Sequence, residues 1–206
     1  MFKRNHMLRI ISLVLSCCLL LLLVSSLAEE SIPYTEHNVN PIVRVHLSRL
    51  NLTDRLDVTL TTPYGLTFGR DGAELYVESG SEITFLLRNG SIYLYMEGLS
   101  LRLGDSVYLR RYAEDGAEGK ERPGFYRTGF DPLYLGDLHL TINEGKLYPV
   151  LNIHVEDYLL GVVPYEMSDT FPVEALKAQT IAARTYVLRK ADADKPYDVV
   201  ATTNDQ

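Results

Sequence analysis

Alternation of apolar and polar residues with a period of two runs through most of the chain from Ile42 to Val150. Several runs combine this alternation with β-branched and aromatic residues, and turn-forming residues separate them, which is typical of β-strands. The dipeptide Asn89-Gly90 lies between two of these runs, and Asn-Gly is the strongest short-range signal for a two-residue hairpin. We therefore predict a β-rich region with the strands IVRVHL, LDVTLTT, AELYVE, EITFLLR, SIYLYME and SVYLRRY.

A polar stretch over residues 114–124 interrupts this pattern and contains glycine, proline and six charged residues. Such a composition is typical of a long loop or a domain boundary. Beyond it, residues 137–143 alternate again, Glu144-Gly145 is a turn signal, and residues 146–153 complete a second hairpin. We predict an α+β fold, with a β-rich region at 41–118 and a second domain at 119–206, where this hairpin precedes a helix-loop-helix.

The amino-terminal segment has the parts of a secretory signal. Basic residues precede an uncharged apolar run from Ile10 to Val24, and the small residues Ser26 and Ala28 form a cleavage site before Glu29. An uncleaved membrane anchor stays open as an alternative, because the apolar run approaches the ~20 residues of a spanning helix. Both interpretations confine membrane contact to residues 1–28, make residues 29–40 a linker, and place the rest of the chain outside the cytoplasm.

Composition disfavours several classes of function. The chain has two cysteines, Cys17 and Cys18, and both fall within the apolar run, so the mature segment has no disulfide and no thiolate for chemistry. The formal net charge of -7 and the lack of a basic run disfavour nucleic acid as a partner. His46, His139 and His154 are widely spaced, without ligand-like spacing, so we predict no metal and no cofactor.

One carboxylate is the best candidate for chemistry. Residues 156–163 have helical spacing, and we expect Pro164 to end that helix, since the residue before a proline is pushed out of the α region. Residues 173–190 are rich in alanine and leucine and predict a second helix. Glu166 therefore lies in the tight connection between the two helices.

The second helix is apolar or small on most of its circumference, which predicts a buried helix. At 100° per residue, one of its stripes consists of Leu176, Thr180, Ala183 and Val187. Lys177 and Arg184 share another stripe. Two interpretations of these cations are open: they hold a ligand in an adjoining cleft, or they pair with Glu166 or Glu174 and pin the helices together.

Three blocks around Glu166 resemble the core motif of the SpoIID/LytB family, which comprises stage II sporulation protein D and the amidase-enhancer proteins. The blocks are YLLGVVPYEM at 158–167, EALKAQ at 174–179 and AARTY at 182–186. Upstream, YLGDL at 134–138 is similar to the family's entry strand. The resemblance covers residues 121–206, with a looser likeness back to Ile42.

The resemblance implies that Glu166 is the catalytic residue of a peptidoglycan lytic transglycosylase, acting in cell-wall remodelling during sporulation. Such an enzyme needs a single carboxylate, because the substrate supplies its own nucleophile, whereas ordinary glycosidases need two. We expect burial against Val163, Tyr165 and Met167 to keep Glu166 protonated before the reaction. The residues assigned to shaping the cleft or holding the glycan are Lys177, Gln179, Arg184 and Tyr186.

Two other functions stay open. The first is a non-catalytic accessory that binds the cell wall and enhances an N-acetylmuramoyl-L-alanine amidase, as the LytB name implies. The second is a degenerate wall-binding protein that keeps only a remnant of the active domain. The expected partners are peptidoglycan glycan strands and, for the accessory function, a cell-wall amidase.

The chain departs from the family pattern after the second helix. Members usually continue with a Tyr-Asp segment, a stretch that contains Cys or His, and a Gln. Tyr197-Asp198 and Gln206 look like that segment, but the intervening VVATTND has no Cys or His. We therefore expect no metal site there, and a catalytic domain that is incomplete at Gln206, which puts the activity of this chain in question.

Overall fold

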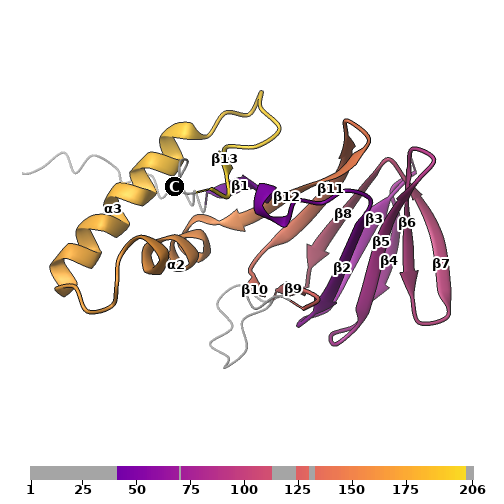
Figure 1. Cartoon of the computed structure of the whole chain (residues 1–206), viewed down its shortest axis with the longest axis horizontal. Helices are drawn as coiled ribbons and strands as arrows, with labels where there is room; N and C mark the ends of the chain where they lie inside the picture. The colour runs from indigo at the N-terminus through magenta and orange to yellow at the C-terminus, as the bar shows by residue number, and fades with distance from the viewer. Residues whose placement is uncertain (1–40, 70, 113–123, 130–132, 203–206) are drawn as a thin grey trace, which may run out of the picture. The chain divides into compact units, whose positions relative to one another are not determined.

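The computed structural model describes residues 41–69, 71–112, 124–129 and 133–202 (Figure 1). The signal or anchor predicted at 1–28 and the linker predicted at 29–40 lie outside these residues. All but one residue of the polar stretch at 114–124 lies outside them as well. Within the described ranges, none of the helices has the length and apolar character needed to cross a membrane.

The described strands form two sheets (Figure 1). The seven-stranded sheet has the order β13 (Val199–Val200), β1 (Ile42–His46), β12 (Lys146–His154), β11 (Asp137–Asn143), β8 (Ser106–Arg111), β3 (Tyr64–Phe68) and β4 (Ala73–Val77). The six-stranded sheet has the order β10 (Leu133–Tyr134), β9 (Phe125–Arg127), β2 (Arg55–Leu60), β5 (Glu82–Arg88), β6 (Ser91–Met96) and β7 (Leu99–Gly104). Strand neighbours pair antiparallel, except β1 with β13, which is parallel.

The described residues include one short helix near β1 and two longer helices near the end of the chain. A short 3-10 helix, η1 (Ser48–Leu50), comes directly after β1. The two longer helices are α2 (Val155–Glu166) and α3 (Val173–Lys190). This order confirms the predicted α+β class, with a β-rich region, a hairpin and then two helices.

All the strands predicted from the period-two pattern are present, and both predicted hairpin turns are confirmed. Asn89 and Gly90 have φ angles of 49° and 70° between β5 and β6. Glu144 and Gly145 have φ angles of 50° and 73° between β11 and β12. Two successive residues with positive φ are what a type I′ turn requires, and this turn matches the twist of the flanking strands.

The structure adds strands that were not predicted. They are β3, β7, and the short β9, β10 and β13. Strands from both sides of the predicted boundary near residue 118 share the two sheets: β8 pairs with β11, and β2 pairs with β9. The division at 118 stays a prediction.

The inward-facing residues of both sheets belong to one hydrophobic core, which extends to α2 and α3. Its largest fully buried side chains are Tyr64, Phe85 and Phe125. The hydroxyl of Tyr64 donates a 2.8 Å hydrogen bond to the carbonyl of Gly136, and burial raises the pKa of this tyrosine. A side chain at Gly136 would have its Cβ 2.4 Å from the carbonyl oxygen of Asn152, so only glycine fits this approach.

Candidate functional site

The helix that carries Glu166 continues directly from a nine-residue strand. β12 ends at His154 and α2 begins at Val155, so no loop separates the sheet from the helix. The Nδ1 atom of His154 accepts a hydrogen bond from the backbone N–H of Glu156 at 3.2 Å. His154 therefore caps the helix, a role that its isolated position in the sequence did not suggest.

Pro164 does not end the first helix, contrary to the prediction. α2 contains Pro164 and continues to Glu166. Proline lacks the backbone N–H that a helical position donates to the carbonyl four residues earlier, so α2 continues past Pro164 without the hydrogen bond to the carbonyl of Leu160. The preceding turns are held by the buried side chains of Tyr158, Leu159 and Val162, and this packing outweighs the local cost.

Glu166 is the last residue of α2 and is exposed to solvent. Its carboxylate makes no hydrogen bond or ion pair with any other residue in the described part of the chain. The expectation of burial against Val163, Tyr165 and Met167 is wrong in this structure, because Glu166 is exposed and Tyr165 is itself 54% exposed. The carboxylate is thus open to a ligand.

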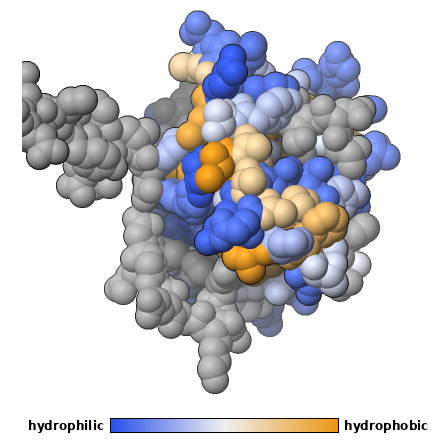
Figure 2. All heavy atoms as spheres, turned by 90° about the vertical axis from the view of Figure 1, so that its left-hand side faces the viewer, coloured by the Kyte–Doolittle hydropathy of each residue, from blue (hydrophilic) through white to orange (hydrophobic). Residues whose placement is uncertain are grey.

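α3 packs along one stripe and leaves the rest of its surface open. Ala183 and Val187 are buried, and Leu176 and Thr180 are partly buried, as the predicted stripe required. The prediction that the whole helix is buried is wrong. Several apolar side chains of α2, α3 and their connection lie at the surface of this end of the molecule (Figure 2), namely Leu160, Tyr165, Phe171, Val173, Ile181, Tyr186 and Leu188.

Lys177 and Arg184 of α3 pair with acids other than Glu166. Arg184 donates from Nε and Nη2 to the two carboxylate oxygens of Glu156, at 2.8 and 2.7 Å, and this hydrogen bonding lowers the pKa of Glu156. Lys177 pairs with Glu174 on its own helix at 2.8 Å. The predicted pairing with Glu166 or Glu174 is thus found for Lys177 with Glu174, but this pair lies within one helix and does not join the two. Arg184 does join α3 to α2, with Glu156 as its partner instead of Glu166 or Glu174.

Helix geometry separates Arg184 from the candidate acid. Glu156 and Glu166 are ten residues apart in α2, which corresponds to about 15 Å along the helix axis. Arg184 is therefore held near the start of α2, while Glu166 lies at its end. Of the other predicted glycan-holding residues, Gln179 is partly buried and Tyr186 is 38% exposed, with the Lys190 ammonium 4.8 Å from its ring centre.

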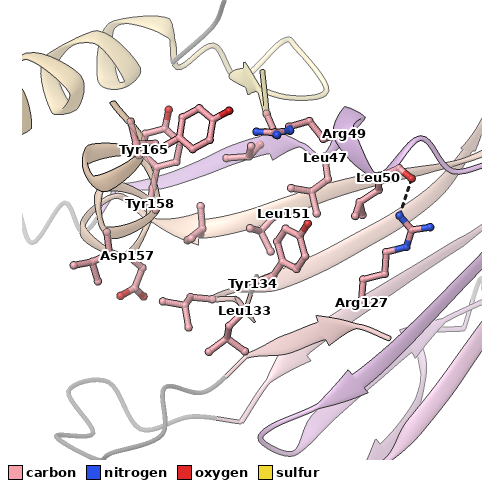
Figure 3. Close-up of a pocket in the computed structure, with 17 residues that line it drawn as sticks. Leu47, Arg49, Leu50, Arg127, Leu133, Tyr134, Leu151, Asp157, Tyr158 and Tyr165 are labelled. Carbon is pink, nitrogen blue, oxygen red and sulfur yellow. Dashed lines mark hydrogen bonds between the residues drawn. The ribbon is translucent and has the colours of Figure 1, made fainter. Parts of the chain in front are cut away.

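A pocket of about 690 Å³ lies beside α2 (Figure 3). Its walls come from α2, from β1 and η1, and from residues of β9, β10 and β12. Tyr165 lines it next to Arg49, whose guanidinium lies 5.4 Å from the centre of the tyrosine ring. Most of the lining is apolar, and the charged groups are Arg49, Arg127 and Asp157. The pocket thus reaches the residue directly before Glu166.

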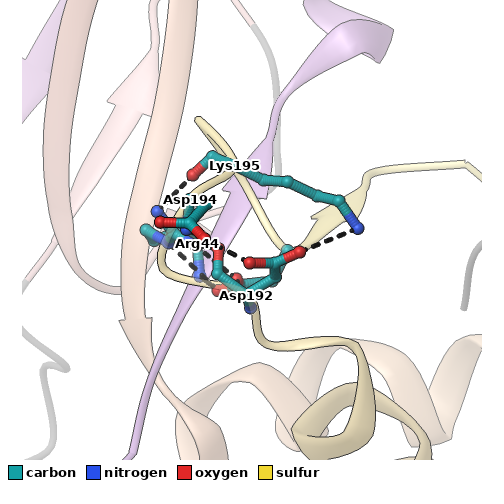
Figure 4. Close-up of polar contacts among 5 residues, drawn as sticks. Arg44, Asp192, Asp194 and Lys195 are labelled. Carbon is teal, nitrogen blue, oxygen red and sulfur yellow. Dashed lines mark hydrogen bonds and ion pairs between the residues drawn. The ribbon is translucent and has the colours of Figure 1, made fainter.

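Arg44 fastens the segment after α3 to the sheet (Figure 4). Its Nη1 and Nη2 atoms donate to the carbonyls of Lys195 and Asp192, each at 2.5 Å. Nη2 also forms an ion pair with the buried carboxylate of Asp198 at 2.6 Å. Burial raises the pKa of Asp198, but hydrogen bonds from the side chain and backbone of Arg44 and from the backbone of Asp192 outweigh it and lower the pKa overall.

This network was not predicted from the sequence. The Tyr197-Asp198 pair was noted for its resemblance to the family, and the structure gives Asp198 an anchoring role. Among the described side chains, no group of three or more His, Cys, Asp or Glu residues is placed to hold a metal ion.

Comparisons with known proteins match a family model to the region that contains Glu166. The model of the SpoIID family, described as stage II sporulation protein, matches residues 143–206. Stage II sporulation protein D of Bacillus subtilis is 58% identical over 61 residues, which cover 30% of this chain and 18% of that protein. Its counterpart in Bacillus amyloliquefaciens is 52% identical over 85 residues, which cover 37% of this chain and 25% of that protein.

A longer match extends into the β-rich region. An uncharacterized protein of Brachyspira hyodysenteriae is 32% identical over 165 residues, which cover 78% of this chain and 42% of that protein. The chain thus spans less than half the length of each of these relatives. No solved structure matches. The residues that the family model matches include both helices and Glu166, so residues 143–206 are similar to the SpoIID domain of stage II sporulation proteins.

Proposed function

We propose that the protein is a peptidoglycan lytic transglycosylase in which Glu166 is the general acid and base. One observation carries this proposal. Glu166 is an exposed carboxylate at a helix end that no described residue engages, although Arg184 and Lys177 on the neighbouring helix are both paired with other acids. The place of this open carboxylate within the matched family region, at the end of α2 and accessible to a ligand, favours a role in chemistry.

The proposed reaction needs one carboxyl group in two protonation states. Protonated Glu166 gives its proton to the glycosidic oxygen as the bond between N-acetylmuramic acid and N-acetylglucosamine breaks. The C6 hydroxyl of the muramic residue attacks the anomeric carbon, and the Glu166 carboxylate takes the hydroxyl proton. The products are a 1,6-anhydromuramic end and a free hydroxyl on N-acetylglucosamine, and Glu166 is again protonated.

The pocket beside α2 offers a place for the sugar next to the bond that breaks. It borders Tyr165, the residue before Glu166, and it combines apolar walls with two arginines. Pockets with mostly apolar walls and a few polar groups are the usual form of small-ligand sites. Because Glu166 is exposed in the free chain, we expect bound glycan to exclude water from the carboxyl group and so favour its protonated form.

Digestion of purified glycan strands tests this function. The chain is expected to release 1,6-anhydromuramic ends, which mass spectrometry identifies, and Glu166→Gln is expected to lower their rate of formation by about 10²- to 10⁴-fold. Glu174→Gln is the matched control, since it neutralises another exposed carboxylate on the adjacent helix. Full activity of Glu166→Gln, or no anhydro ends from the wild-type chain, would refute the proposal.

A second candidate function is favoured by the exposed apolar side chains of α2 and α3. Seven large hydrophobic residues at this end are between 38% and 64% exposed, which is more typical of a protein-binding surface than of a free one. In this alternative the chain binds the cell wall and enhances a partner amidase without cleaving glycan. Stimulation of a purified amidase that is equal for wild type and Glu166→Gln, and lost in Ile181→Ser/Leu188→Ser, would support it.

A further inference from the structure

The seven-stranded sheet has a second face, opposite to the core, which we call the outer face. Along β11 the core receives Leu138 and Leu140, so His139 between them points to the other side. Three residues lie in one line across the sheet: His46 on β1, His139 on β11 and Tyr108 on β8. Val150 of β12 is the register partner of both His46 and His139, and His139 is in turn the register partner of Tyr108. Aromatic side chains therefore share this face across several strands.

Rings gather at the β1 edge of the outer face. His46 stacks on Tyr148 of β12, with ring centres 4.1 Å apart and planes inclined by 19°. Tyr197, from the segment that Arg44 fastens, lies 5.3 Å from His46. All three side chains are partly exposed. The ordered segment after α3 thus extends an aromatic surface that begins on the sheet.

Two further ring pairs continue the surface toward the opposite edge. Tyr108 and His139 lie 5.7 Å apart in the middle of the sheet, and Tyr76 and Tyr112 lie 5.7 Å apart near β4. Tyr76 is 57% exposed and Tyr112 is 49% exposed. Gly65 allows the last pair to lie on the sheet, because a Cβ at this position would come within 3.0 Å of the Tyr112 ring.

Polar groups and one positive charge accompany the rings. The Ser106 hydroxyl lies 3.0 Å from Nε2 of His139, and burial lowers the pKa of this histidine, which favours the neutral imidazole. Arg110 is exposed, with its guanidinium carbon 5.9 Å from the centre of the Tyr108 ring. No carboxylate in the described part of the chain forms an ion pair with Arg110. Two carboxylates share this face: Glu74 accepts a hydrogen bond from the Tyr112 hydroxyl, and the charge of Asp137, whose pKa burial raises, interacts with that of Arg110. Neither forms an ion pair with Arg110, whose guanidinium is exposed.

We propose that the outer face binds a strand of N-acetylated, carboxylate-bearing glycan that crosses the β-strands. A pyranose ring has apolar C–H faces that suit aromatic rings and a rim of hydroxyls that suits serine, histidine and tyrosine. Neighbouring β-strands are about 4.8 Å apart, close to the advance of one β-1,4-linked sugar, so successive sugars meet successive strands. On strands whose stem peptides have been removed, the lactyl carboxylate of the muramic sugar is free and complements Arg110.

This surface is separate from the proposed catalytic residue. α2 packs on the side of β1 that carries Val45 and Leu47, since these residues line the pocket with Tyr158 and Val162. His46 points to the opposite side of the same strand. The outer face therefore holds glycan away from Glu166. The identity of the glycan rests on the proposed function, but its binding does not depend on catalysis.

Cosedimentation with purified peptidoglycan glycan strands tests the proposal, with the full chain in a Glu166→Gln background so that no substrate is consumed. Tyr76→Ser/Tyr112→Ser is expected to weaken binding by about tenfold, since each ring contributes roughly half of the 1.4 kcal/mol that a tenfold change represents. The matched control is Tyr93→Ser/Tyr95→Ser on β6 of the other sheet, which should bind like the parent. Circular dichroism confirms that each variant is folded.

The charge is tested with a second pair of variants. Arg110→Gln is expected to weaken binding of muramic-acid-containing strands several-fold and to leave binding of uncharged chitin oligosaccharides unchanged. Arg88→Gln is the control, because Arg88 makes the same kind of contact with Tyr95 at 6.0 Å on the six-stranded sheet. Folded outer-face variants that bind within twofold of the parent, or control variants that lose as much, would overturn the proposal.

These results separate the two proposals. If strands bind through the outer face and the wild-type chain forms no anhydro ends, the catalytic proposal fails and the binding surface stands. If anhydro ends form and the outer-face variants bind and cleave like wild type, the binding surface fails alone.

Discussion

Removing the Asp198 carboxylate should detach the segment after α3 from the sheet. In the folded chain this carboxylate accepts hydrogen bonds from the backbone N–H and two side-chain nitrogens of Arg44, and from the backbone N–H of Asp192. The side chain of Asp198 is 3% exposed and that of Arg44 is 26% exposed. Asp198→Ala therefore leaves a largely buried guanidinium without its counter-charge.

The expected cost follows from the burial of the pair. Removal of one partner from a buried ion pair costs about 3–5 kcal/mol, and the partial exposure of Arg44 places this site near the lower limit. A cost of about 3 kcal/mol corresponds to a rise of roughly 100-fold in the population of the detached state. Detachment breaks the hydrogen bond from the backbone N–H of Ala201 to the carbonyl of His46, which is 2.9 Å long.

Hydrogen exchange at the Ala201 amide measures this detachment. We expect exchange to accelerate roughly 100-fold in Asp198→Ala, because exchange of a docked segment follows its local opening. Lys195→Ala is the control: it removes an exposed pair with Asp192 but keeps the Lys195 carbonyl that Arg44 contacts, so the change should be within about twofold. Equal exchange rates in the two variants would refute the anchoring role of Asp198.

Two further predictions concern stability. Tyr64→Phe should lower the free energy of unfolding by about 1–2 kcal/mol, measured by urea denaturation, because the buried carbonyl of Gly136 loses its partner; Tyr93→Phe, whose hydroxyl makes no hydrogen bond with a described residue, should have no effect. The second concerns pH. Because the hydrogen bond from Arg184 lowers the pKa of Glu156 in the folded chain, its stabilisation is present above the ordinary carboxyl pKa and is lost as the pH falls through the folded value. The wild type should therefore lose slightly more free energy of unfolding than Arg184→Gln between about pH 6 and pH 3. The difference should be less than about 1 kcal/mol, because the pair is exposed. Equal losses in the two proteins would contradict the stabilising effect of the pair at neutral pH.

The strands and hairpin turns could be predicted because local signals determine them. Period-two alternation identifies a half-buried strand, and Asn89-Gly90 and Glu144-Gly145 supply the positive φ angles that the turns need. The end of α2 could not be predicted in this way. Pro164 is unfavourable in a helix locally, but the packing of Tyr158 and Val162 on the core extends the helix past it, and that packing depends on residues distant in sequence.

The candidate site was predicted in part. The motif located Glu166. Whether its side chain is exposed depends on which other elements surround it in the folded chain, and residue spacing along one helix does not show that. The ion-pair partners of the charged residues could not be predicted from the sequence either. Arg184 is 28 positions from Glu156, and Arg44 is 154 positions from Asp198, so only the folded chain brings these pairs together.

Because β12 continues directly into α2, the number of residues from His154 to Glu166 determines where the Glu166 carboxylate lies relative to the sheet. The sheet holds the start of α2 in place, and each residue of the helix then adds a fixed rise along the axis and a fixed rotation about it. One inserted or deleted residue in α2 would turn the carboxylate by about 100° and shift it by about 1.5 Å, with no loop to absorb the change. The β6–β7 turn, by contrast, can change length without moving Glu166. Insertions and deletions among related sequences should accordingly be absent between His154 and Glu166 and tolerated in the β6–β7 turn.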